Sequence, residues 1–212
     1  MLNKRSKYKI PGLPKAQGLY NPSNEHDACG VGMVLDIQNR ASYDIVEKGL
    51  AMLCNLEHRG AVGADPRAGD GSGLLIQIPH KFLKKKTSAD FDLPDAGNYA
   101  VGVIFMPKEN NTQEKIKDLV KKTCLHEEIN ILGWRLCPTH TDDLGWSVLP
   151  STPDVFQLFL ERPDNEKNQD DFERKLYILR RCIEEAVLKI HKTVKEGFYI
   201  PSFSSRTILY KG

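Results

Sequence analysis

One long amphipathic helix constrains the fold of this chain more than any other feature of its sequence. Apolar residues recur along it at steps of three and four, the pattern of a helix that buries one face. The stripe consists of Phe172, Leu176, Leu179, Ile183, Val187, Ile190 and Val194. Because a stripe this regular is suited to packing on a sheet, the sequence predicts sheets covered by helices.

Short apolar runs of β type supply candidate strands for those sheets. We expect strands at 31–37, 74–78, 99–106, 133–137 and 155–160, and a hairpin from 198–201 to 206–210 with its turn at 202–205. The runs are separated by helical patterns, so the class expected is α+β.

Two further helices are expected between these runs. Apolar residues at helical spacing from 45 to 56 end just before His58-Arg59-Gly60. A plausible capping box, Asn111 with Glu114, begins another helix. That helix should turn inward an apolar set made of Ile116, Leu119, Val120 and Cys124.

Charge and hydropathy exclude several function classes. The 212 residues carry a formal net charge of +2, and residues 1–20 hold five Lys or Arg and no acid. A basic tail is usually a solvated arm, so we expect no nucleic-acid partner. No apolar run follows the tail as in a secretory signal, and no run of 18 apolar residues could span a bilayer. We therefore expect no membrane association and a cytoplasmic location.

The cysteines favour neither a disulfide scaffold nor a metal site. Their number is odd and no CxxC pair occurs, so no zinc or iron–sulfur ligand set is expected. The five are Cys29, Cys54, Cys124, Cys137 and Cys182. We interpret all but Cys29 as packing residues, since most free cysteines behave as small buried hydrophobes.

Cys29 stands apart because small residues flank it, Ala28 before and Gly30 after. Cleavage between Ala28 and Cys29 would give one residue both a thiol and a free α-amine, whose reference pKa is about 7.7–8.0. Such an amine can activate the side chain of its own residue, with no His or Asp partner. Cys29 is therefore the candidate nucleophile, and residues 1–28 the candidate leader. The competing interpretation is one more buried cysteine.

The segment 63–73 is so rich in glycine that only a loop fits it. We expect this loop beside a ligand, the alternative being a flexible surface connection. No GK[ST] ending follows the glycines, which argues against a phosphate cradle.

Several motifs follow one another in order along the chain: Cys29-Gly30-Val31-Gly32, His58-Arg59-Gly60-Ala61, Gly63-Ala64-Asp65, Gly69-Asp70-Gly71-Ser72-Gly73, Gly133-Trp134-Arg135, Phe172-Glu173-Arg174, Phe198-Tyr199-Ile200-Pro201-Ser202, Ser204-Ser205-Arg206-Thr207 and Tyr210-Lys211-Gly212. Together they resemble the class II glutamine amidotransferase domain with which the large subunit of glutamate synthase begins. The resemblance runs from about residue 24 to 212. The family implies a four-layer αββα sandwich of the N-terminal-nucleophile hydrolase type, incomplete here, with the amidotransferase domain at 29–212 after a leader at 1–28.

What the resemblance implies for chemistry is hydrolysis of glutamine to glutamate and ammonia through a glutamyl thioester on Cys29. Ammonia would pass to 2-oxoglutarate in other glutamate synthase domains or subunits, which hold FMN and an iron–sulfur cluster and draw electrons from NAD(P)H or ferredoxin. No cofactor is expected in this chain itself. Its partners would be glutamine and those remaining domains.

Arg59 matches the family's arginine near the nucleophile, where a guanidinium can bind the substrate or support the site through its fork of donors. The alternative is an arginine that only caps the helix end. His58 is interpreted as structural, because the amine makes an imidazole base unnecessary. Asp65 and Asp70 are each either loop-capping carboxylates or substrate ligands, and neither receives a role.

The family's oxyanion donors come from an Asn-Gly pair, and this chain has no such dipeptide. Losing one oxyanion donor typically costs on the order of a hundred- to a thousandfold in rate. We therefore expect a truncated domain with weak or absent glutaminase activity. Two alternatives stay open: the branch of phosphoribosylpyrophosphate amidotransferase and asparagine synthetase, and an inactive binding or assembly module of the same fold.

Overall fold

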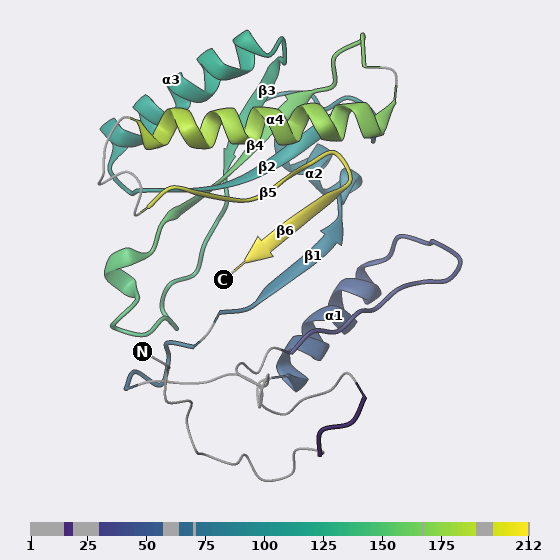
Figure 1. Cartoon of the computed structure of the whole chain (residues 1–212), viewed down its shortest axis with the longest axis vertical. Helices are drawn as coiled ribbons and strands as arrows, with labels where there is room; N and C mark the ends of the chain where they lie inside the picture. Colours follow the sequence, from purple (N-terminus) through teal and green to yellow (C-terminus); the bar gives the residue numbers. More distant parts are fainter. Residues whose placement is uncertain are drawn as a thin grey trace.

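The computed structural model describes residues 15–18, 30–56, 64–69, 71–166, 168–189 and 197–211. Both helices and antiparallel strands occur in them (Figure 1), which confirms the α+β class. The elements are α1 (Tyr43–Asn55), β1 (Gly73–Gln77), α2 (His80–Thr87), β2 (Tyr99–Met106), α3 (Asn110–His126), β3 (Ile131–Leu136), β4 (Asp154–Glu161), α4 (Gln169–Leu188), β5 (Tyr199–Ser204) and β6 (Thr207–Lys211), with a 3-10 turn, η3 (Leu149–Ser151).

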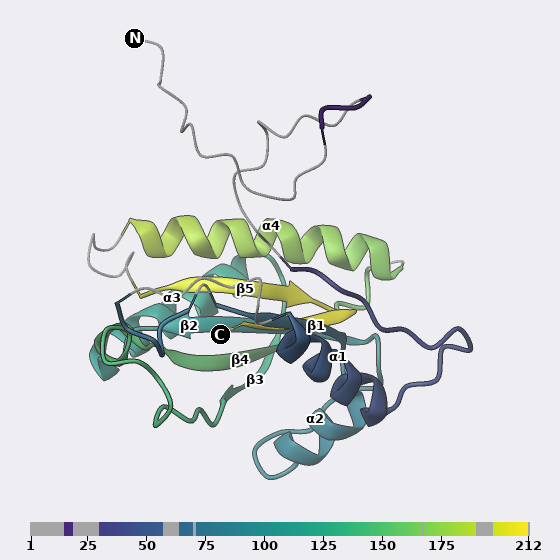
Figure 2. The same ribbon diagram turned by 90° about the horizontal axis from the view of Figure 1, so that it is seen from below.

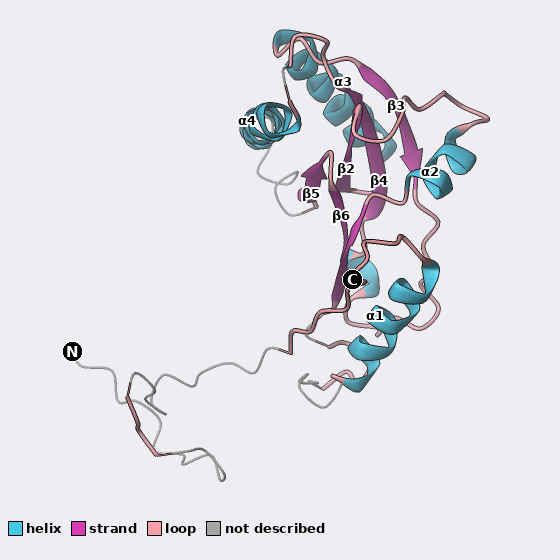
Figure 3. Cartoon of the chain, turned by 90° about the vertical axis from the view of Figure 1, so that its right-hand side faces the viewer, coloured by secondary structure: helices cyan, strands magenta, loops and turns pink. Residues whose placement is uncertain are grey.

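Four strands form the main sheet in the order β3-β4-β2-β5, with every neighbour antiparallel. The chain order β2-α3-β3-β4-α4-β5 is that of the split βαβ arrangement. Both α3 and α4 lie on the same face of this sheet (Figure 3). A separate two-stranded sheet, β1 with β6, lies on the other side of the main sheet from these helices (Figure 1).

The first hydrophobic core fills the space between the helices and the main sheet. Alternate residues of β2 and β4 enter it, and the stripe of α4 packs against them. The residues of that stripe that the structure describes are fully buried: Phe172, Leu176, Leu179, Ile183 and Val187. Ile190 and Val194 lie outside the described residues. The expected packing of this helix on a sheet is confirmed.

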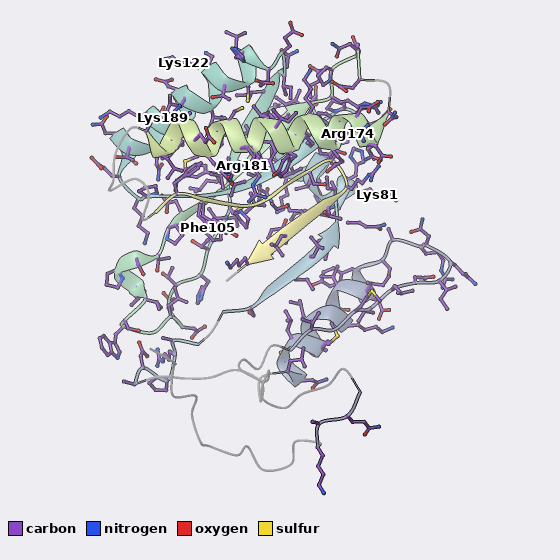
Figure 4. The ribbon with its side chains drawn as sticks, viewed as in Figure 1. Lys81, Phe105, Lys122, Arg174, Arg181 and Lys189 are labelled. Atoms are coloured by element: carbon purple, nitrogen blue, oxygen red, sulfur yellow. The ribbon has the colours of Figure 1, made fainter. Side chains whose placement is uncertain are left out.

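The outer surface of the helical layer carries charged side chains. Figure 4 labels Lys122 on α3 and Arg174, Arg181 and Lys189 along α4. The side chain of Arg174 is 68% exposed and that of Arg181 is 55% exposed. This polar outer face completes the amphipathic pattern of both helices.

A second core lies on the opposite face of the main sheet. It joins Val101 and Phe159 of the sheet to Leu83 of α2 and Ile208 of β6. Figure 2 shows the main sheet edge-on, with α4 on one side of it and α2 on the other. No helical pattern predicted α2, because Leu83 is the one apolar residue that this short, lysine-rich helix buries.

The expected hairpin at the end of the chain is wrong. β5 pairs with β2 and β6 pairs with β1, so the two strands belong to different sheets. The connection between them is only Ser205 and Arg206. Glu173 of α4 holds this connection: its Oε1 accepts hydrogen bonds from the Ser205 N–H and hydroxyl, each at 2.6 Å, and from the Ser204 hydroxyl at 3.1 Å.

Two other expectations are also corrected. The run 31–37 pairs with no strand among the described residues. The helix α3 begins at Asn110, with Glu109 at its N-cap and no side-chain cap, so Asn111 and Glu114 form no capping box. Instead the Thr112 hydroxyl donates to the Glu109 carboxylate at 2.7 Å.

Two neighbours on α4 test whether this helix holds the first core together. We expect Leu176→Ala to lower the free energy of unfolding by about 2–5 kcal/mol, because a fully buried leucine leaves a cavity. Tyr177→Ala, at a side chain that is 64% exposed, should change it by less than about 0.5 kcal/mol. Urea unfolding followed by circular dichroism measures both, and equal effects would contradict the packing.

Candidate functional site

The candidate nucleophile Cys29 and the candidate substrate-binding or site-supporting Arg59 lie outside the described residues, as do His58 and Asp70. Their nearest described neighbours in the chain are therefore the evidence for the site. Gly30 follows Cys29 directly, and Leu56 precedes Arg59 by three residues.

Gly30 and Leu56 are in contact. A Cβ built on Gly30 would lie 3.1 Å from Cδ2 of Leu56, so the Leu56 side chain occupies the space beside the Gly30 backbone. The segment that follows the candidate nucleophile thus contacts the segment that precedes the candidate arginine. This contact lies at the C-terminal end of α1, where Leu56 is the C-cap residue.

A second contact of the same kind lies one turn earlier on α1. A Cβ on Gly32 would lie 2.0 Å from Sδ of Met52, a separation that no side chain can adopt. The step of two from Gly30 to Gly32 matches the step of four from Leu56 to Met52, so the segment runs antiparallel to α1. Glycine lets the backbone approach the helix this closely.

The residues that follow each of these glycines, Val31 and Met33, face away from α1. Val31 is 91% exposed and Met33 is 80% exposed. This alternation is the strand-like pattern that the sequence showed. The apolar side of the segment has no cover among the described residues.

Asp65 forms a second feature of the site region. One carboxylate oxygen accepts hydrogen bonds from the Ser147 N–H at 2.9 Å and the Ser147 hydroxyl at 2.7 Å, and the other from the Arg67 N–H at 3.1 Å. Asp65 is only 5% exposed. Of the two readings left open for it, the structure shows a loop-capping carboxylate, which ties the glycine-rich loop to residues 141–148.

The fit at Asp65 is close. A Cβ on Gly145 would lie 2.4 Å from Oδ2 of Asp65, so residue 145 can carry no side chain there. Donation by the Ser147 N–H and hydroxyl holds the pKa of Asp65 below its ordinary value, and burial opposes this shift only partly.

A polar network that no sequence motif predicted links the main sheet to β6. The Arg135 guanidinium donates to Oε1 of Gln157 at 2.8 Å, and the Gln157 amide donates to the Tyr210 hydroxyl at 3.2 Å. Gln157 is fully buried. Burial raises the pKa of Tyr210 above its ordinary value. The available signal was a glutamine inside the apolar run 155–160, since a buried polar side chain needs partners.

The remaining cysteines divide by environment. Cys124 is buried, and burial raises the pKa of its thiol to about 12. Cys137 and Cys182 are partly buried, whereas Cys54 is exposed and so contradicts its assignment as a packing residue. In the part of the chain that the structure describes, no three His, Cys, Asp or Glu side chains gather as a metal site would require. No described helix combines the length and the apolar character needed to cross a bilayer.

Residues 29–212 match the family of class-II glutamine amidotransferases. The chain belongs to this family. The match begins at Cys29, the residue that the sequence singled out as the nucleophile.

Three relatives of this amidotransferase chain are glutamate synthases. The glutamate synthase (NADPH) large chain of Bacillus subtilis is 41% identical over 202 residues, covering 94% of this chain and 13% of that protein. The glutamate synthase (NADH) of Saccharomyces cerevisiae is 39% identical over 212 residues, covering 94% and 10%. The chloroplastic ferredoxin-dependent glutamate synthase of Oryza sativa subsp. japonica is 38% identical over 199 residues, covering 93% and 12%. The chain spans about a tenth to an eighth of the length of these relatives.

The solved structures that match part of the chain include the C-terminal domain of the MgtC protein from Mycobacterium tuberculosis. It is 17% identical and covers 57% of this chain and 94% of its own. Its TM-score of 0.27 is too low to bear on the fold.

The acidity of Asp65 gives a test of its role. A folded-state pKa below the unfolded value of about 3.9 means that the ionised carboxylate stabilises the fold above that pH. This contribution is lost as the pH falls through the lower folded value. We expect Asp65→Asn to lower the melting temperature at pH 7 and the gap from wild type to narrow below about pH 4.

Melting curves between pH 7 and pH 3, followed by circular dichroism, measure this gap. The matched control is Asp143→Asn, at a side chain that is 97% exposed, which should leave the melting temperature unchanged throughout. A gap for Asp65→Asn that stays constant with pH would contradict the assignment.

Proposed function

We propose that this chain is the glutaminase portion of a glutamate synthase, hydrolysing glutamine to glutamate and ammonia. The observation that carries the proposal is the family match over residues 29–212, which begins at Cys29. The three relatives named above are glutamate synthases and are 38–41% identical over nearly the whole chain. Residues 1–28 are then a leader whose removal frees the Cys29 amine.

The proposed reaction has two halves. The Cys29 thiol attacks the side-chain amide carbonyl of glutamine, and its proton passes through the Cys29 α-amine to the departing ammonia. The product is a glutamyl thioester on Cys29. Water then attacks the thioester, which releases glutamate and restores the thiol. The α-amine, with a reference pKa of about 7.7–8.0, is suited to exchange protons near neutral pH.

Arg59 is assigned to hold the substrate or to support the site, through its planar set of donors. The contact between Gly30 and Leu56 supports this pairing, because it joins the two chain segments that lead to Cys29 and Arg59. Arg59 acting only as a helix cap is the alternative, and Arg59→Ala with unchanged glutamine binding would favour it.

The proposal extends to the fold and to the partners. We propose that the complete domain is a four-layer αββα sandwich, of which α3 and α4 form one helical layer and the main sheet the layer beneath. Ammonia is transferred to 2-oxoglutarate in other glutamate synthase domains. The proposal assigns FMN and the iron–sulfur cluster to those domains and no cofactor to this chain.

The first test is the intact mass of the purified protein, with and without 6-diazo-5-oxo-norleucine, a glutamine mimic that alkylates such nucleophiles. We expect loss of residues 1–28 and a single adduct on Cys29. Cys29→Ser should abolish the adduct. Cys54→Ser, which removes an exposed cysteine, should leave it intact. A full-length, unlabelled chain would point instead to the inactive module of the same fold.

A further inference from the structure

The helix α1 presents two side chains, one turn apart, to the segment that follows Cys29. Met52 and Leu56 are both half-buried and share one face of the helix. Gly32 lies against Met52 and Gly30 against Leu56. Among the described residues, 31–35 make no backbone hydrogen bond and no strand pairing, and the contacts with Met52 and Leu56 place the start of the segment against α1.

We propose that Met52 and Leu56 are positioning residues for the Cys29 thiol. This inference rests on the proposed function, in which Cys29 is the nucleophile. Neither side chain touches the reacting atoms in this assignment. They act by fixing the backbone of Gly30, the residue bonded to Cys29, and consecutive Cα atoms are separated by about 3.8 Å.

Size is what makes this contact specific. A side chain at position 32 would overlap Sδ of Met52, with only 2.0 Å between their atoms. Position 30 is tighter than ordinary packing, since its Cβ would lie 3.1–3.3 Å from three atoms of Leu56. Added volume at position 32 must therefore displace either the flexible Met52 side chain or the segment itself, and added volume at position 30 requires Leu56 to give by a few tenths of an ångström. A displacement of about 1 Å can lower a reaction rate by on the order of a hundredfold.

The experiment adds side-chain volume at Gly32 and removes it at Met52. Gly32→Ala, Met52→Ala and the double variant are compared in the full chain. The readout is the rate of Cys29 alkylation by 6-diazo-5-oxo-norleucine, relative to alkylation by iodoacetamide. The first reagent needs the glutamine geometry, whereas the second needs only an accessible thiol.

We expect Gly32→Ala to slow alkylation of Cys29 by the glutamine mimic about 10- to 100-fold. The rate of alkylation by iodoacetamide should change by less than about twofold. In the double variant, loss of the Met52 side chain should relieve the overlap and restore most of the rate. Leu56→Ala removes volume without any overlap, and should slow the mimic even if Gly32→Ala fails to fold. Tyr43→Ala, at a side chain of α1 that is 70% exposed, is the matched control and should behave as wild type.

The outcomes separate the two proposals. If the wild-type chain does not react with the mimic, the glutaminase proposal fails and the positioning role falls with it. If the wild type reacts and the folded variants react equally fast, only the positioning role is overturned. Equal slowing of alkylation with both reagents also overturns the positioning role, because a purely structural role would not slow the glutamine mimic selectively. The same holds if the folded double variant does not regain the alkylation rate.

Discussion

The described structure depends on strand β2, which is buried on both faces. Seven of its eight residues are buried, and it pairs with β4 on one side and β5 on the other. Its alternate side chains enter different cores, with Ile104 beneath the helices and Val101 facing α2 and β6. A strand in this position must be apolar throughout, as the sequence of β2 is. The two hydrophobic cores therefore lie on its two faces.

This dependence explains which parts of the fold could be predicted from the sequence. The strand β2 and the stripe of α4 each carry a long pattern set by burial, and both were located correctly. The pairing of β5 and β6 was not, because two adjacent strands with a short turn look alike whether they pair with each other or separate. In the structure the turn between them is held by the carboxylate of Glu173, a helical residue that lies 32 residues before Ser205. No local pattern encodes such a contact.

The site region follows the same division between local and distant information. The candidate nucleophile was identified from its immediate neighbours in the sequence, Ala28 and Gly30. The partners of Asp65 were out of reach, since Ser147 and Gly145 lie some eighty positions further along the chain. The network through Gln157 joins three strands in the same way. A polar residue within an apolar run shows that partners are needed, but not which residues supply them.

The glycines beside Cys29 combine both kinds of information. From the sequence, Gly30 stood out only as a small residue that flanks the candidate nucleophile. The contacts with Leu56 and Met52 give the glycines a structural task, which is to let the backbone lie directly on α1. A nucleophile carried on a segment with few hydrogen bonds of its own needs such a support, because reactivity depends on orientation as well as on the thiol. The absence of a side chain at Gly30 and Gly32 therefore lets the backbone that follows Cys29 lie directly on α1 and so fixes the position of the nucleophile.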